Sequence, residues 1–136
     1  LAGVSDEFIE QHVRFRGRLT GEDKWEAFRE SDTFVLPTFY ESENMTLVVI
    51  EALGSGLPVI STHWRGIPRL IQDGETGFLV EPENKAALTE KLAWCMRNTK
   101  RLDVMRDSAR KAYESSYSVE AFKENLRMIL GDVGIG

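Results

Sequence analysis

The chain has 136 residues, enough for one domain with a sizeable core. Its composition, 42% hydrophobic and 29% charged with a formal net charge of -5, excludes a disordered or fibrous protein. It also argues against a nucleic-acid partner, because binding to backbone phosphates needs a concentrated basic face. No apolar run approaches the roughly 20 residues that cross a bilayer. Cys95 is the single cysteine and cannot form an internal disulfide, which fits a cytoplasmic protein.

Four short apolar runs predict four strands. They cover residues 13–15, 33–36, 58–61 and 77–80. The first is closed by Gly17 and the second by Pro37, and the last follows the turn Asp73-Gly74. Continuous apolar runs of this length are typical of parallel strands that are buried on both faces of a sheet.

Helical segments separate the strands in the first half of the chain. Thr20 is a candidate cap for a helix that would bury Trp25 and Phe28. The stretch 47–53 is ambiguous by composition, because its two adjacent valines favour a strand. Thr46 before it and the glycines after it favour a helix, and we expect a helix here.

Three further helices are predicted after the last strand. Asn84 and Ser118 are the expected caps of the first and third. Each helix carries one apolar stripe at helical spacing, formed by Leu88, Leu92, Cys95 and Met96, by Leu102, Met105, Ala109, Ala112 and Tyr113, and by Val119, Phe122, Leu126, Ile129 and Leu130.

This alternation predicts an α/β fold, a Rossmann-like three-layer domain with a parallel sheet. A doubly wound domain normally has five or six strands, which exceeds the four expected here. The chain also begins at Leu1 rather than at Met. We therefore expect residues 1–136 to be a partial domain that lacks its first strand-helix units.

Two carboxylates stand near a predicted helix end. Ligands of such sheets bind at the carboxyl ends of strands, where the N-terminus of a helix attracts anions. Glu43 lies in the loop before the helix that starts at Thr46, and Glu51 lies in its second turn. Carboxylates accept hydrogen bonds from sugar or ribose hydroxyls, and helix amides hold a diphosphate. Taken alone, either glutamate is more often merely solvated.

The residues from 34 to 60 resemble the C-terminal domain of retaining glycosyltransferase family 4, whose members have the two-domain GT-B architecture. The family signature, two glutamates separated by seven residues, is matched by Glu43 and Glu51. The segments 65–68 and 73–80 are similar to the next two landmarks of the family, and 13–17 resembles an upstream strand and turn. The resemblance therefore spans nearly the whole chain.

The resemblance implies a role for each matching position. Glu43 would be the catalytic-site contact to the sugar of the donor, and Glu51 would bind the ribose hydroxyls. The Arg16-Gly17 turn would lie near the base. Diphosphate and sugar would be held by the segment Asn44, Met45, Thr46, Leu47 and Val48. No metal and no cofactor is implied.

Two parts of the sequence depart from the family pattern. Family members often have Gly, an aromatic residue and then Gly or Pro after the first glutamate, where this chain has Asn44, Met45 and Thr46. Arg69 stands where the family commonly has Glu, so no role is assigned to it.

The resemblance implies the donor-binding part of an enzyme that transfers a sugar from a nucleotide-diphosphate sugar to an acceptor hydroxyl with retention. The pathway would be polysaccharide, lipopolysaccharide or glycolipid synthesis. The acceptor would bind to an N-terminal domain absent from this sequence, and the full-length protein would be cytoplasmic or peripheral at the inner face of the membrane. We expect the fragment alone to be inactive. The alternative is a GT-B-like module that binds nucleotide without transferring sugar.

Overall fold

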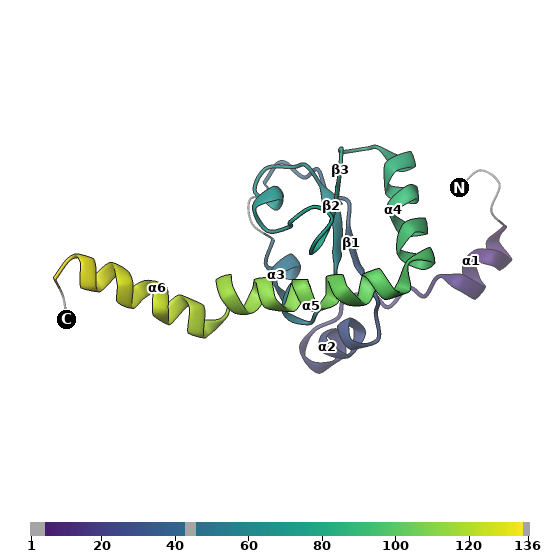
Figure 1. Ribbon diagram of the computed structural model, residues 1–136. Helices are drawn as coiled ribbons and strands as arrows, with labels where there is room; N and C mark the ends of the chain where they lie inside the picture. The colour runs from purple at the N-terminus through teal and green to yellow at the C-terminus, as the bar shows by residue number, and fades with distance from the viewer. Residues whose placement is uncertain (1–4, 43–45, 135–136) are drawn as a thin grey trace.

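A computed structural model describes residues 5–42 and 46–134. A short helix comes first, helices and strands then alternate between residues 21 and 80, and three helices follow (Figure 1). The elements are α1 (Asp6–His12), α2 (Gly21–Arg29), β1 (Phe34–Leu36), α3 (Leu47–Gly54), β2 (Val59–Thr62), the 3-10 helix η1 (Ile67–Arg69), β3 (Gly77–Val80), α4 (Lys85–Arg97), α5 (Thr99–Ser116) and α6 (Val119–Asp132).

The described strands form one parallel sheet in the order β1-β2-β3. Phe34 of β1 lies opposite Val59 of β2, which in turn lies opposite Gly77 of β3. Parallel neighbours require crossover connections, and α3 and η1 lie in these connections. The predicted α/β class and three of the predicted strands are therefore confirmed.

Helices cover both faces of the sheet, as expected for parallel strands. One face packs against α2, α3 and η1 in a cluster that includes Phe28, Leu53, Val59 and Ile67. The other face packs against α4, with Ile60 and Phe78 beside the buried Cys95. Helix α5 runs past the ends of the strands and contributes to both clusters (Figure 1). This gives three layers.

The strand expected at residues 13–15 is not formed. The segment between α1 and α2 is extended but has no regular structure, and the side chains of Val13 and Phe15 are 61% and 95% exposed. A strand of three residues is stable only when a neighbour pairs with it and an apolar surface covers it. Within the described part of the chain neither is supplied, so the alternating pattern of Val13 to Arg16 produces no strand.

The ambiguous stretch after Thr46 is helical, as predicted. Val49, Ala52 and Leu53 of α3 are completely buried against the sheet and α5. Burial of this apolar face outweighs the modest preference of β-branched residues for strands. Thr46 occupies the N-cap position, and Gly56, at φ +72°, turns the chain away after the helix.

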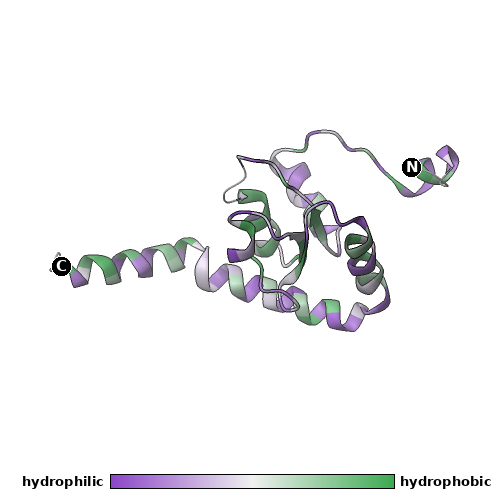
Figure 2. Ribbon diagram, turned by 90° about the horizontal axis from the view of Figure 1, so that it is seen from above, coloured by the Kyte–Doolittle hydropathy of each residue, from purple (hydrophilic) through white to green (hydrophobic). Residues whose placement is uncertain are grey.

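The three C-terminal helices also form where predicted. Asn84 caps α4 by accepting a hydrogen bond from the Ala87 amide at 3.0 Å, and Ser118 caps α6 through the Ala121 amide at 3.1 Å. In the stripe of α5, Leu102, Met105 and Ala109 are buried and Ala112 and Tyr113 are half-buried, whereas Met96 of α4 is exposed. Helix α6 projects from the body with its apolar stripe uncovered (Figures 1 and 2). Across the described residues, no helix is long and apolar enough to cross a membrane.

Candidate functional site

Glu51 lies in the second turn of α3, facing α2. Its Oε1 accepts a hydrogen bond from Lys24 Nζ at 2.7 Å, and the two side chains are 31% and 28% exposed. Helix α2 is fixed against the sheet by the buried Phe28, whose ring packs edge-on against Phe34 at 5.7 Å between centroids. The pair is therefore held between two helices that are anchored to the same core.

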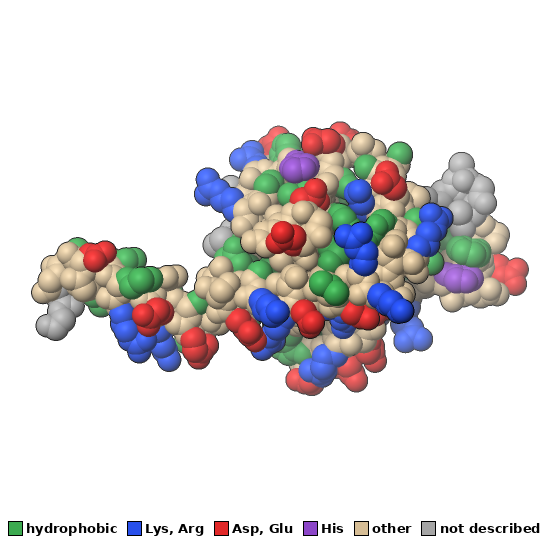
Figure 3. Space-filling model, in the orientation of Figure 1, with side chains coloured by type: hydrophobic (Ala, Val, Ile, Leu, Met, Phe, Trp, Pro, Cys, Tyr) green, Lys and Arg blue, Asp and Glu red, His purple; other side chains and the backbone are tan. Residues whose placement is uncertain are grey.

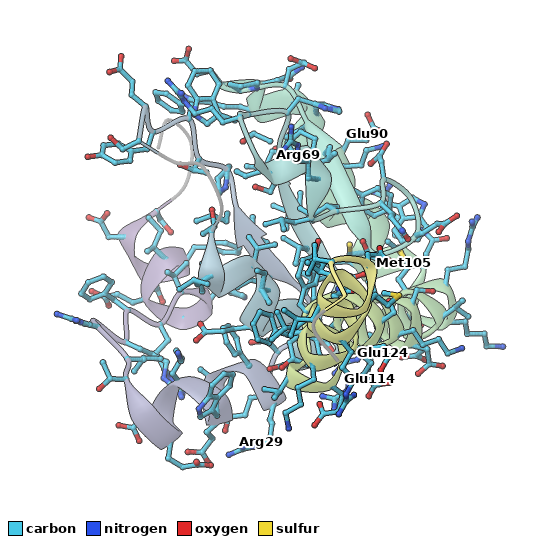
Figure 4. The ribbon with its side chains drawn as sticks, turned by 90° about the vertical axis from the view of Figure 1, so that its left-hand side faces the viewer. Arg29, Arg69, Glu90, Met105, Glu114 and Glu124 are labelled. Atoms are coloured by element: carbon cyan, nitrogen blue, oxygen red, sulfur yellow. The ribbon has the colours of Figure 1, made fainter. Side chains whose placement is uncertain are left out.

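A cavity of about 600 Å³ opens beside Glu51. Its lining combines aromatic, basic and apolar side chains from α2, α3 and α5, namely Trp25, Arg29, Leu47, Ile50, Glu51, Gly54, Ser55, Arg110, Tyr113 and Tyr117. Figure 4 shows Arg29 at the lower edge of the molecule, and Glu114 of α5 is labelled in the lower half of the same view. The prediction that Trp25 is a core residue is wrong, because it is 37% exposed and lines this cavity.

Helix α3 begins where the sequence predicted, directly after Thr46, so the partial positive charge of a helix N-terminus lies there. The first backbone N–H groups of a helix have no hydrogen-bond acceptor within that helix. In α3 these are the N–H groups of Leu47 and Val48. The next amide, that of Val49, donates to the Thr46 carbonyl oxygen at 3.0 Å. Leu47 also exposes its side chain and lines the cavity that contains Glu51. The predicted residues Glu43, Asn44 and Met45 lie outside the described part of the chain.

The described start of the loop toward Glu43 is held by two side chains at the end of β2, those of Thr62, its last residue, and of Trp64 just after it. Thr62 donates its hydroxyl to the Thr38 carbonyl oxygen. Trp64 donates its indole N–H to the Tyr40 carbonyl oxygen at 2.8 Å. Thr62 is buried, so its hydrogen bond is shielded from water. These anchors come from a segment more than twenty positions away, and no sequence pattern pointed to them.

The predicted Arg16-Gly17 turn precedes α2, and the Arg16 side chain contacts the residue that follows this helix. Gly17 adopts φ +65°, a conformation that favours glycine, and Arg16 Nη1 lies 3.4 Å from Glu30 Oε2. Glu30 directly follows α2, whereas Lys24 within α2 contacts Glu51. Arg16 and Glu51 thus contact different residues of the α2 segment, and Lys24 is a contact that the sequence analysis missed.

The charges around the site are mixed. Glu51 is negative, Lys24 is positive, and the helix end carries a partial positive charge. Figure 3 shows basic and acidic side chains interspersed over the face in view. Within residues 5–42 and 46–134, no three His, Cys, Asp or Glu side chains group as metal ligands. The arrangement suits a ligand that combines hydroxyl groups with a negatively charged group.

Known proteins resemble this chain in sequence and in fold. The family model described as glycosyl transferases group 1 matches residues 4–112. Among curated relatives, the sulfoquinovosyl transferase SQD2 of Arabidopsis thaliana is 37% identical over 103 residues, which are 74% of this chain and 20% of that protein. The chain thus spans about a fifth of that relative's length.

Solved structures show the same fold at low sequence identity. The C-terminal domain of a glycosyl transferase group 1 family protein from Francisella tularensis is 24% identical with a TM-score of 0.68, covering 77% of this chain and 53% of that chain. HepE of Anabaena in complex with UDP and glucose is 20% identical with a TM-score of 0.77, covering 93% and 35%. The fold is thus that of the C-terminal part of GT-B structures.

Proposed function

This chain belongs to the glycosyl transferases group 1 family, and on that premise we propose that it forms the nucleotide-sugar-binding part of a retaining glycosyltransferase. The observation that carries the proposal is the position of Glu51. It lines a cavity of about 600 Å³ beside the first turn of α3, so a carboxylate and a helix N-terminus border one space. A nucleoside diphosphate carries both ribose hydroxyls and phosphates, the two kinds of group that a carboxylate and a helix N-terminus bind.

In this proposal Glu51 accepts hydrogen bonds from the ribose hydroxyls. A carboxylate has two oxygens and can accept from two neighbouring hydroxyls, each bond being stronger than one between neutral groups. Its cavity also exposes apolar and aromatic surface from Trp25 and Leu47. The relative HepE has been solved with UDP and glucose, which supports a ligand of this class.

The diphosphate would lie at the start of α3. The amides of Leu47 and Val48, with the segment Asn44, Met45 and Thr46 before them, would hold it by hydrogen bonds and by the helix dipole. The same end would stabilise the charge that develops on the departing nucleoside diphosphate. Glu43 would contact the sugar near its reacting carbon, a role that rests on the family resemblance.

The remaining features of the proposal concern the whole protein. We propose that the sugar is transferred to an acceptor hydroxyl in polysaccharide, lipopolysaccharide or glycolipid synthesis, in the cytoplasm or at the inner face of the membrane. The acceptor would bind to a domain outside this sequence. The base of the nucleotide would lie near Arg16 and Gly17. A similarity to SQD2, a sulfoquinovosyl transferase, supports sugar transfer as the reaction.

Replacement of Glu51 tests the proposal. Glu51→Gln should weaken the binding of UDP, GDP or ADP, whichever binds most tightly, by about 1–3 kcal/mol, because a charged acceptor of hydrogen bonds is lost. The measurement is isothermal titration calorimetry. Glu90→Gln is the matched control, because Glu90 also lies on a helix beside a lysine, Lys91, but away from the cavity (Figure 4). Equal affinities for both variants would contradict the proposed role.

A further inference from the structure

We propose that Lys24 is a positioning residue of the site, holding the Glu51 carboxylate in the orientation that receives the ribose hydroxyls. This inference rests on the proposed function of Glu51. Lys24 lies 27 positions before Glu51, on a different helix, and its Nζ lies 2.7 Å from Glu51 Oε1. The bond occupies one carboxylate oxygen on the α2 side and directs the carboxylate as a whole.

The surroundings of this ion pair differ from those of the others. In every other ion pair of the described residues, at least one partner is 56% or more exposed. Lys24 and Glu51 are both less than one third exposed. Since water screens exposed pairs and their side chains move freely, such pairs fix little. A pair shielded by two packed helices loses less to screening and holds its geometry better.

A third group restrains the lysine. The Lys24 ammonium lies 4.6 Å from the centre of the Trp25 ring, a distance at which a cation is attracted to an aromatic face. Trp25 in turn packs edge-on against the buried Phe28 at 5.8 Å. The ammonium is therefore located by an aromatic ring anchored to the core, and it transmits that position to Glu51.

The consequence is specific for the ribose hydroxyls. If Lys24 orients Glu51, its removal should impair recognition of the hydroxyls rather than binding of the base and diphosphate. The test compares UDP, GDP or ADP, whichever binds most tightly, with its 2′,3′-dideoxy analogue by calorimetry. The affinity for the nucleotide divided by the affinity for the dideoxy analogue measures recognition of the hydroxyls. A general weakening of the fold affects both affinities and cancels from this ratio.

We expect Lys24→Gln to lower this ratio by about three- to tenfold, corresponding to the loss of one charge-assisted contact. Lys24→Arg, which keeps the charge, should restore most of the ratio. In a Glu51→Gln background, Lys24→Gln should produce no further decrease. Lys91→Gln is the matched control, because Lys91 of α4 also pairs with a glutamate and lies over an aromatic ring, that of Phe78. This variant should keep the original ratio.

The outcomes separate this inference from the proposed function. If Glu51→Gln lowers the ratio while Lys24→Gln leaves it unchanged, Lys24 has no positioning role and the proposed function of Glu51 stands. If Lys24→Gln weakens both ligands equally, its role is structural and the inference is overturned. If the original chain binds none of the nucleotides at millimolar concentration, or if Glu51→Gln leaves the ratio unchanged, both fail.

Discussion

Gly77 is the position at which the sheet tolerates a side chain least. It begins β3 opposite Val59, and a Cβ atom added there would lie 1.9 Å from the Val59 carbonyl oxygen. It would also lie 2.8 Å from the Val59 amide nitrogen. Real Cβ atoms essentially never approach other atoms within 3.0 Å, so one strand must move by about 1 Å.

The cost of Gly77→Ala follows from the place of Val59 in the sheet. Because β2 pairs with β1 on its other side, a displacement disturbs both ladders. Overpacking costs about 1–3 kcal/mol, and each weakened hydrogen bond adds about 1 kcal/mol. We expect a loss of at least about 3 kcal/mol in the free energy of unfolding, which is a large part of the 5–15 kcal/mol typical of a domain.

The assay is urea unfolding followed by far-ultraviolet circular dichroism. Gly131→Ala is the matched control, because Gly131 lies in α6 with no atom within 4 Å of an added Cβ, and its effect should stay within about 1 kcal/mol. Gly54→Ala should fall between the two, because its Cβ would meet the Tyr113 ring at 3.0 Å. A Gly77→Ala protein as stable as the original would refute the register assigned to β2 and β3.

The remaining predictions concern the loop anchors and the buried thiol. Thr62→Val removes the hydroxyl bound to the Thr38 carbonyl oxygen and should lower the free energy of unfolding by about 1–2 kcal/mol in urea, whereas a loss below about 0.5 kcal/mol would contradict the anchor. Trp64→Phe removes the hydrogen bond to the Tyr40 carbonyl oxygen. It should weaken nucleotide binding severalfold in calorimetry with little loss in the free energy of unfolding. Unchanged affinity would mean that this loop does not contribute to the site. Burial raises the pKa of the Cys95 thiol, so its reaction with a disulfide reagent should be slower in the folded than in the unfolded chain. The contribution of Cys95 to the free energy of unfolding should be fully present below the ordinary thiol pKa and should be lost as pH rises through the raised pKa. Equal reaction rates in the folded and unfolded chain, or a urea midpoint that does not change with pH in this range, would contradict the raised pKa.

Most of the fold could be predicted because burial imposes a clear pattern on the sequence. The run at 33–36 and the run at 77–80 are short, apolar and bounded by turn residues, and each forms a buried or half-buried strand. The stripe of α5 is equally regular, and Leu102, Met105 and Ala109 are all buried. These features depend on neighbours close in sequence and on the water-excluding core, both of which a sequence displays.

Predictions failed where a pattern had no partner within the described chain. Val13 and Phe15 alternate with arginines as in a strand, but nothing described pairs with them. Helix α6 shows the same effect on a larger scale, because Phe122 and Ile129 belong to a regular stripe and remain exposed. Helix α1, which was not predicted, buries no residue and is marked in the sequence only by the cap Ser5, which accepts from the Phe8 amide at 3.2 Å.

The helix that carries Glu51 could be predicted from the sequence, but the contacts of Glu51 could not. Glu51 could be identified from its spacing to Glu43 and from the helix that begins after Thr46. Lys24 and Trp64 could not, because their partners lie 27 and 24 positions away in sequence. Such pairings depend on how α2 and the segment after β2 pack against the sheet, which no local pattern encodes.

The central claim is that a nucleotide sugar binds beside the start of α3. The most direct test is to titrate the chain with UDP, GDP, ADP and their sugar conjugates while following backbone amide NMR shifts. We predict shifts concentrated at residues 43–51 and at Arg16 and Gly17, from one nucleotide in preference to the others. No response at millimolar concentration, or shifts confined to α4 and α6, would contradict the claim.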